Sequence, residues 1–359
     1  MILTVFGQSV GTANAETVSD IKSDETVIFF PALAYPTEDA DTWEVKVHGW
    51  IYEASFAGEA AVRSFQAAMD LSENLDAESK TILRKRARYL VVDNERSKQI
   101  VIRLGDKSYP LEESTANGHF VSRFQLSSDE INRHKTANGI IPFEAVMRNG
   151  DSREFKGDIH RLSTTGISVI SDIDDTIKIS EITDKRAALA NAFWKPFRPI
   201  PGMAKLYNHW TEKHADIRFH YVSAGAWQFY APLEQFRGEA GFPPGTYHMR
   251  NFRWKDRSFF EMLDSPVGYK RKVIESLIAV SGRRRFVLVG DSGQSDPEVY
   301  ADIARRYPNR ILRIYIRDVT NQRPDAVRYQ RTFRGVSAGK WTIFRDASEI
   351  DPALPRVSG

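Results

Sequence analysis

Two aspartates, one residue apart, are the residues of this chain whose types and spacing point most directly to chemistry. Asp172 and Asp174 follow the apolar run 167–170, which predicts a short buried β-strand. In an open α/β sheet, the carboxyl ends of the strands border the crevice where ligands bind. Burying carboxylates together is costly unless a cation or a proton compensates their charge. The pair therefore indicates metal-assisted phosphoryl transfer, in which one aspartate attacks phosphorus and the other moves a proton.

Strings of the form Asp-x-Asp also occur as calcium loops, helix N-caps and solvated turns. A calcium-binding EF-hand is a poor fit, because no glycine and no distal glutamate fall at the required loop positions. The choice between phosphoryl transfer and a simple turn therefore depends on whether other parts of such a site follow along the chain.

A second predicted strand, 217–222, ends in Ser223, Ala224 and Gly225. A small hydroxyl residue beside a glycine at the end of a strand can offer its side chain and nearby backbone N–H groups to a phosphate oxygen. Taken alone, these three residues are a weak signal, because Ser-Ala-Gly after a strand usually forms only a turn.

Lys270 opens an amphipathic segment, 270–277, that predicts a helix. A cation there could keep the attacking aspartate ionised and neutralise the phosphoryl group, although a lysine on a helix is commonly solvated. Lys272 is the alternative. Lys270 is preferred because it stands four residues before the apolar Ile274, in the first turn of the helix.

A third predicted strand, 286–289, runs into Gly290 and Asp291, and Asp296 follows five residues later. Carboxylates at a sheet edge are hard oxygen ligands that suit Mg²⁺. Asp296 has a structural alternative, since an aspartate before Pro297 is also typical of a helix N-cap.

As an ordered set, these pieces resemble the haloacid dehalogenase-like phosphohydrolase superfamily over roughly the C-terminal half of the chain. The segments 171–178, 221–225 and 290–298 are more closely similar to one branch, the actin-patch phosphatidate phosphatase family. A weaker similarity extends to 47–53.

The resemblance implies roles for the aspartates. Asp172 would be the nucleophile that forms an aspartyl-phosphate, and Asp174 the general acid and then the general base. Mg²⁺ would be held by the Asp172 carboxylate, the Asp174 backbone carbonyl and Asp291, with Asp296 close by or acting through water. Asp175 falls outside the Asp-x-Asp spacing and is expected to be a hydrogen-bond acceptor behind the site.

The resemblance also implies how the substrate phosphate would be held. Thr176 and Ser223, with Ala224 and Gly225, would bind phosphate oxygens, and Lys270 would bridge the nucleophile and the phosphate.

The chain divides into three expected parts: a disordered or signal-like terminus at 1–22, a β-rich domain at 23–163 and a catalytic domain at 164–359. The middle part predicts an antiparallel, sandwich-like domain, with strands near 27–30, 43–52, 99–104, 120–126 and 141–147 and helices near 59–70 and 77–89. The last part alternates strands with helices, which is typical of a doubly wound parallel sheet. Its helices are expected near 202–214, 228–241, 270–281 and 297–307, and a further strand near 310–316.

Neither gap between the motifs leaves room for a large cap domain, and 241–269 is expected to be irregular. An uncapped site favours a large or membrane-embedded phosphomonoester. The segment 247–260 interleaves aromatic and basic residues, which suits an anionic membrane face or ordinary packing with solvated charges. The basic run 84–88 has the same two interpretations, and Trp227 could contact acyl chains.

Composition limits the class of protein. The 359 residues are 42% hydrophobic and 27% charged, with a net charge of +3, which argues against dedicated nucleic-acid binding. The chain contains no cysteine, so disulfides and thiolate catalysis are excluded. No apolar run is long enough for a transmembrane helix, which leaves a soluble or membrane-peripheral protein. An Ala13-Asn14-Ala15 string without a basic start leaves open a truncated signal peptide, and with it the choice between cytoplasm and export.

The sequence thus predicts a Mg²⁺-dependent phosphatidate phosphatase that releases diacylglycerol and phosphate at a membrane surface. Two alternatives remain. The same chemistry could act on phosphoproteins or soluble phosphomonoesters, or the chain could be a non-catalytic binding module.

Overall fold

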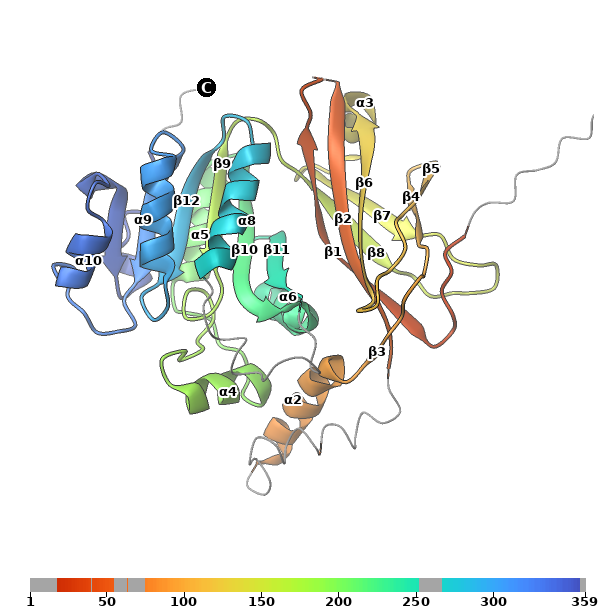
Figure 1. Ribbon diagram of the computed structural model, residues 1–359, viewed down its shortest axis with the longest axis horizontal. Helices are drawn as coiled ribbons and strands as arrows, with labels where there is room; N and C mark the ends of the chain where they lie inside the picture. Colours follow the sequence, from red (N-terminus) through yellow and green to blue (C-terminus); the bar gives the residue numbers. More distant parts are fainter. Residues whose placement is uncertain (1–17, 40, 55–62, 64–74, 252–266, 356–359) are drawn as a thin grey trace, which may run out of the picture.

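The computed structural model describes residues 18–39, 41–54, 63, 75–251 and 267–355. Two β-sheets lie side by side, one formed by the N-terminal half of the chain and the other by the C-terminal half (Figure 1). The helix expected at 59–70 and the basic-aromatic residues 252–260 lie outside the described residues, apart from residue 63.

The N-terminal sheet has the strand order β3-β2-β1-β8-β7-β4-β5, with β6 also paired to β2. Its strands are β1 (Glu25–Pro36), β2 (Thr42–Glu53), β3 (Asp93–Asn94), β4 (Val101–Leu104), β5 (Lys107–Pro110), β6 (His119–Ser127), β7 (Ile140–Ala145) and β8 (Lys156–Arg161). The expectation of a β-rich domain is confirmed. The expectation of antiparallel pairing is wrong for one described pair, since β1 and β8 run parallel. Two short helices, α2 (Ala77–Ala87) and α3 (Ser128–His134), and the 3₁₀ turn η1 (Arg88–Leu90) accompany this sheet.

Strand β1 contributes buried aromatic side chains to both faces of the N-terminal sheet. Phe29 packs edge-on against Phe120 and Phe143 in the core of this sheet, whereas Phe30 points to the opposite face, toward the C-terminal half. A register shift between Phe30 and Leu33 reverses the alternation, so that Leu33 also faces outward. The N-terminal domain was expected to begin at residue 23, but residues before it already contact this sheet. The Ser19 backbone N–H donates to the carbonyl of Val146 at 2.9 Å.

The C-terminal sheet is parallel throughout its described strands, in the order β11-β10-β9-β12-β13-β14. Its strands are β9 (Ile167–Asp172), β10 (Ile217–Ala226), β11 (Gly245–Arg250), β12 (Arg285–Asp291), β13 (Ile311–Arg317) and β14 (Trp341–Phe344). Its helices are α4 (Lys185–Phe193), α5 (Met203–Lys213), α6 (Tyr230–Glu239), α8 (Val267–Val280), α9 (Asp296–Arg306) and α10 (Val327–Thr332), with short 3₁₀ turns η2 (Trp227–Phe229), η3 (Ala338–Lys340) and η4 (Ala347–Glu349). The expected alternation of strands and helices is confirmed.

Both faces of this sheet are buried, which explains why its central strands are apolar along their whole length. Val169 of β9 belongs to the same apolar cluster as Tyr207 of α5, and the next residue, Ile170, belongs to a second cluster with Ile274 of α8 and Val299 of α9. Helices therefore cover both faces of the sheet, whereas the edge formed by the carboxyl ends of its strands can carry polar groups.

The expectation that 241–269 is irregular is wrong for its first part, because β11 pairs with β10 along the edge of the sheet. Thr246 and His248 alternate with Tyr247 and Met249, so one face of the strand is polar and its apolar pattern is weak. Those polar groups are satisfied locally: Thr246 Oγ1 lies 2.8 Å from His220 Nδ1 and 3.1 Å from His248 Nε2.

Aromatic rings join the two halves of the molecule. The ring of Phe30 lies 4.1 Å from that of Trp227 and 5.0 Å from that of Tyr230, measured between centroids. Trp227 is only 7% exposed. The tryptophan that could have contacted acyl chains instead packs between the two sheets, against Phe30 and His48.

None of the helices in the described part of the chain combines the length and the apolar character needed to cross a bilayer.

Candidate active site

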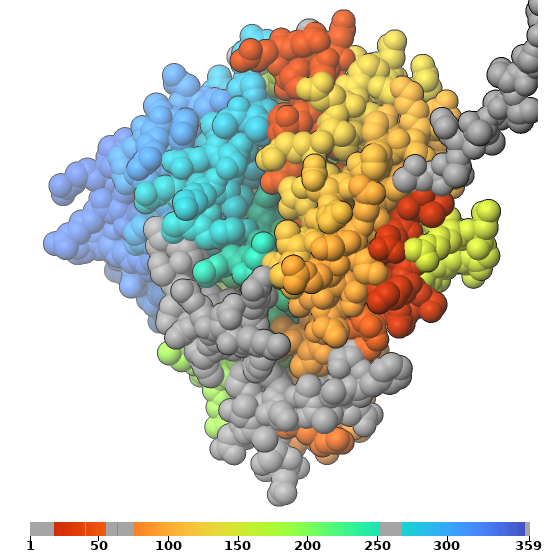
Figure 2. All heavy atoms as spheres, turned by 45° about the vertical axis from the view of Figure 1, so that its right-hand side comes forward, coloured from red at the N-terminus to blue at the C-terminus, as the bar shows by residue number. Residues whose placement is uncertain are grey.

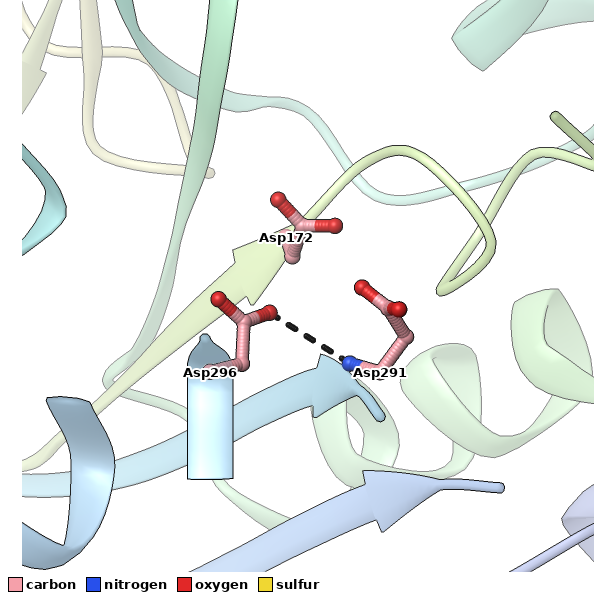
Figure 3. Close-up of side chains that lie close together, drawn as sticks. All are labelled: Asp172, Asp291 and Asp296. Atoms are coloured by element: carbon pink, nitrogen blue, oxygen red, sulfur yellow. Dashed lines mark hydrogen bonds between the residues drawn. The ribbon is translucent and has the colours of Figure 1, made fainter. Parts of the chain in front are cut away.

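Three carboxylates meet at the carboxyl edge of the C-terminal sheet. Asp172 ends β9, Asp291 ends β12, and Asp296 is the first residue of α9 (Figure 3). One carboxylate oxygen from each lies within 4.8 Å of those from the other two, and the side chains are buried. Adjacent parallel strands end at the same edge of a sheet, which is why residues over a hundred positions apart converge here.

Lys270 provides the cation of this cluster. Its Nζ lies 2.6 Å from Asp172 Oδ1 and 2.5 Å from Asp296 Oδ1, and the residue is 1% exposed. Helix α8 begins at Val267, so Lys270 does stand in its first turn. Lys272 is exposed and lies on another face of the helix, which leaves Lys270 as the lysine of the site.

Asp296 does not cap its helix. The N-cap residue of α9 is Ser295, and the Asp296 carboxylate turns into the cluster, where Oδ2 accepts the Asp291 backbone N–H at 3.3 Å (Figure 3). The helix-cap alternative for Asp296 is therefore wrong. Gly290 makes room for this carboxylate, because a Cβ at that position would lie 2.3 Å from Asp296 Oδ2.

The cluster holds more negative charge than its lysine neutralises. Burial raises the pKa of Asp172 well above its ordinary value, and Asp296 and Asp291 raise it further, while Lys270 opposes them. Burial, followed by the nearby Asp296, raises the pKa of Asp291 to about 7. Burial alone would lower the pKa of Lys270, but Asp172 and Asp296 raise it overall. These shifts describe a site that a further cation would stabilise.

One oxygen of the cluster has no partner. Asp291 Oδ1 accepts the Gly293 backbone N–H at 2.6 Å, whereas Oδ2 is buried and makes no hydrogen bond within the described residues. Buried polar atoms are rarely left unsatisfied, and those that are call for a missing ion, a water or a functional role. Three convergent carboxylates with one free oxygen fit a hard divalent cation such as Mg²⁺.

Asp174 stands beyond the end of β9 and is engaged by a second lysine, to which the sequence assigned no role. Lys178 Nζ lies 2.9 Å from Asp174 Oδ1, and Ser180 Oγ donates to the same oxygen at 2.6 Å. Burial would raise the pKa of Asp174, but Lys178 and Ser180 lower it overall. Lys178 could have been noticed from its position four residues after Asp174 in the first motif.

The remaining residues of the first motif shape the loop. Asp175 has a left-handed backbone (φ +54°) and accepts three successive backbone N–H groups, those of residues 180, 181 and 182, at 2.7–2.9 Å. Thr176 is buried, and its Oγ1 lies 3.5 Å from Asp172 Oδ2. The loop thus turns back on Asp175 while Asp172 and Asp174 face the site.

The end of β10 completes the site. Ser223 Oγ donates to Asp174 Oδ2 at 3.3 Å and accepts the Gly225 backbone N–H at 3.0 Å. Ala224 and Gly225 are partly exposed beside it. The structure therefore brings all of the residues selected from the sequence to one edge of the sheet.

A small apolar cavity of about 70 Å³ adjoins Asp174 and Ser223. Its apolar lining comes from α4, α6 and neighbouring segments and includes Ile182, Ala188, Phe197, Phe229, Leu233 and Met249.

The Phe197 ring is held between two cations, with Arg86 Cζ 3.5 Å and Lys178 Nζ 4.9 Å from its centroid. Arg86 belongs to α2 and is 7% exposed, and its Nη1 donates to the carbonyls of Asn191 and Ala192 at 3.2 and 2.9 Å. Arg86 is therefore one residue of the basic run 84–88 that is neither solvated nor available to bind lipid. It links the N-terminal half of the chain to the wall of the cavity.

The fold and the site together define an α/β domain whose parallel sheet carries a lysine-bridged aspartate cluster at its carboxyl edge. Residues 167–318 match the family model described as the catalytic domain of phosphatidate phosphatase APP1. This segment is therefore similar to the catalytic domain of the actin-patch phosphatidate phosphatase family.

Two curated relatives extend the comparison. The chain is 35% identical over 167 residues to phosphatidate phosphatase APP1 of Saccharomyces cerevisiae, an alignment that covers 46% of this chain and 28% of the relative. It is 28% identical over 221 residues to an uncharacterized protein of Schizosaccharomyces pombe, covering 59% and 36% of the two chains. The chain thus spans only 28% and 36% of the length of these two relatives.

A solved structure of ferredoxin-NADP⁺ reductase from Plasmodium falciparum with 2′P-AMP aligns with a TM-score of 0.19 at 10% identity, over 81% of this chain and 96% of the other. A similarity at that level carries no argument about the fold.

Proposed function

We propose that this protein is a Mg²⁺-dependent phosphatidate phosphatase with a haloacid dehalogenase-like catalytic domain. The observation that carries the proposal is the buried cluster of Asp172, Asp291 and Asp296 bridged by Lys270, with one carboxylate oxygen left free. The family of the segment that contains the cluster supports the same reaction.

In the first half-reaction, a carboxylate oxygen of Asp172 attacks phosphorus and the ester P–O bond breaks. Lys270 holds Asp172 Oδ1, which leaves Oδ2, beside the Thr176 hydroxyl, as the attacking atom. Asp174 gives its proton to the leaving alkoxide, so that diacylglycerol departs as a neutral alcohol and an aspartyl-phosphate remains on Asp172.

In the second half-reaction, Asp174 takes a proton from water, the water oxygen attacks phosphorus, and the bond to Asp172 breaks to release inorganic phosphate. Lys178 and Ser180 lower the pKa of Asp174 in the free site, which suits the base role. The acid role requires that the negative charge of an arriving phosphate raise that pKa. Ser223, which contacts Asp174, and the partly exposed Ala224 and Gly225 beside it are positioned to bind the phosphate oxygens.

The carboxylates of Asp172, Asp291 and Asp296 would hold Mg²⁺, together with the backbone carbonyl of Asp174. The ion would supply positive charge for the phosphoryl oxygens. The free Oδ2 of Asp291 and the excess of carboxylates over lysine support this assignment.

Two features support a lipid over a soluble phosphomonoester. The cavity beside Asp174, where the leaving group would lie, has an apolar lining that suits a hydrophobic alcohol. Between Asp174 and Ser223, the described residues add only short elements, α4 and α5, and no cap domain.

Phosphate release from phosphatidate in detergent micelles, with and without Mg²⁺, tests the proposal. Soluble phosphomonoesters are the parallel substrates, Asp172→Asn is the test variant, and Asp325→Asn, at an exposed surface carboxylate, is the matched control. Mg²⁺-dependent release that is fastest from phosphatidate and lost only in Asp172→Asn would support the proposal. Release from soluble esters alone would support the proposed mechanism but contradict a lipid substrate. The absence of release from every substrate would favour a non-catalytic binding module.

A further inference from the structure

A groove of about 580 Å³ separates helix α8 from the outer face of the N-terminal sheet. In Figure 2, α8 (cyan) and β6 (yellow) face each other along this boundary. Helix α8 contributes one face, with Tyr269, Lys272, Val273, Ser276, Leu277 and Val280 at helical spacing, and β11 lines the groove between the two halves. The volume is in the range of pockets that hold ligands of a few hundred daltons.

The opposite wall places two cations directly across from each other. Lys46 of β2 pairs in register with Arg123 of β6, and both side chains are exposed. Like charges directly opposite in an antiparallel pair destabilise a sheet.

Glu44 offsets only part of this charge. Its carboxylate accepts from the Tyr35 hydroxyl and lies 3.3 Å from Arg123 Nε. Lys46 makes no ion pair among the described residues, and neither does Lys272, which faces the groove from α8. The described lining includes no aspartate or glutamate, so the groove carries a net positive charge.

Part of the lining is aliphatic. Leu33, Val121, Val273, Leu277 and Val280 contribute aliphatic surface, and Met249 borders both this groove and the cavity beside Asp174. Val121 is 43% exposed, which makes it one of three large hydrophobic residues exposed in the described part of the chain. Val121 is therefore exposed on the same wall as Lys46, which has no ion pair among the described residues, and Arg123, which Glu44 partly neutralises.

We propose that this groove binds an anionic amphiphile, a single-chain lipid whose headgroup pairs with Lys46, Arg123 and Lys272 and whose chain covers the aliphatic residues. The anion relieves the cross-strand repulsion of Lys46 and Arg123, and the chain removes Val121 and its neighbours from water. The site is separate from the aspartate cluster and does not depend on the proposed phosphatase activity.

Calorimetric titration of the full chain with decanoate at submicellar concentration tests this site, because decanoate has the charge and the chain but no phosphate to lose. The expected result is saturable binding with a stoichiometry of one. Lys46→Gln combined with Arg123→Gln should weaken it at least about tenfold, through the loss of two charged contacts. Ser276→Trp should remove it by filling the groove from an exposed helix position. Arg148→Gln combined with Lys156→Gln, at exposed cations outside the groove, should leave it unchanged.

Two further ligands separate the parts of the proposal. Decanol carries the chain without the charge, and inorganic phosphate carries charge without the chain; both should bind much more weakly than decanoate. The proposal is overturned if either binds as tightly as decanoate, or if decanoate binding survives both the charge variant and Ser276→Trp. Because decanoate cannot be hydrolysed, these outcomes are independent of whether the protein acts on phosphatidate.

Discussion

The two ends of the parallel sheet each bury charged groups, and they treat them in opposite ways. At the amino-terminal end, Arg284 is fully buried and its Nη2 donates to the carbonyls of Ile167 and Asp216 at 2.5 and 2.8 Å, while Nη1 lies 3.0 Å from Asp216 Oδ2. At the carboxyl end, Asp172, Asp291 and Asp296 share one lysine.

The difference lies in how fully Arg284 and the aspartate cluster are hydrogen-bonded. Asp216 Oδ1 makes no hydrogen bond among the described residues, but it lies 3.4 Å from Arg218 Nη2. Arg284 is surrounded by acceptors from the strands it joins, so its charge holds the ends of β9 and β10 together. The aspartate cluster keeps an unpartnered oxygen and carboxyl pKa values raised by burial. A buried charge with complete hydrogen bonding is evidence of a structural role, and an incomplete set at a sheet edge is evidence of a ligand.

The largest effect is expected from Asp172→Asn at the carboxyl end. Loss of the nucleophile should lower the rate of phosphate release by at least about 10⁴-fold, while the fold persists because one of several repelling carboxylates has been neutralised. Phosphate release and thermal unfolding of the same samples measure both effects. A variant that retains activity would remove Asp172 from the reaction.

At the amino-terminal end, Arg284→Met should cost about 3 kcal/mol of unfolding free energy, because it leaves the carbonyls of Ile167 and Thr165 without this donor. Asp216 loses one partner but keeps Ser163 and Arg218. Urea denaturation measures the change, and Arg283→Met, at the exposed neighbouring position, is the matched control. Folded Arg284→Met protein should keep its activity. Equal losses of stability in both variants would argue against the structural role of this arginine.

Mg²⁺ should distinguish the two ends directly. At a concentration near 100 times its dissociation constant, the ion should stabilise the wild-type protein by about 2.7 kcal/mol, and it should stabilise Asp291→Asn far less. Thermal unfolding after chelation and re-addition of MgCl₂ measures this, with Asp325→Asn as the control. If Asp291→Asn and the wild type respond alike, Asp291 does not hold the ion.

The smallest effect is expected from a pair of histidines, whose hydrogen bond forms only while one of the two rings is neutral. His48 Nε2 lies 2.9 Å from His119 Nδ1 between the two sheets, a contact that needs a neutral ring as acceptor. Burial lowers the pKa of His119 from 6.5 to about 4. The unfolded chain therefore takes up its proton first, so the stability from this residue is complete above about pH 6.5 and is lost as the pH falls toward 4.

The His119 contribution should amount to about 2.5 kcal/mol between these pH values. Urea denaturation of the wild type and of His119→Gln across this range measures it, and the variant should show the shallower dependence. Parallel curves for the two proteins would contradict the assignment.

Much of the site followed from local spacing. The Asp-x-Asp pair after an apolar run, the Ser-Ala-Gly triplet and the glycine before Asp291 each mark the end of a strand, and a parallel sheet brings such ends together. Helical spacing also selected Lys270 over Lys272. These inferences needed only the order of residues within each segment.

Other features were invisible because they depend on contacts between distant segments. The direction of the Asp296 side chain follows from the position of Lys270 in another helix, and the spacing alone was equally consistent with a cap. Strand β11 was missed because its polar face is satisfied by His220 of the neighbouring strand. Arg86 is buried only because α2 packs on α4.

The sequence by itself determined which residue types stand at strand ends and helix starts, and hence the chemistry available at one edge of the sheet. Only the tertiary structure decided which charges are paired and which are left over: Arg86 on Phe197, the free oxygen of Asp291, and the facing Lys46 and Arg123. The physical reason is that spacing along the chain fixes the direction of a side chain within its element, whereas burial and the nearest opposite charge are set by the packing of elements far apart in sequence.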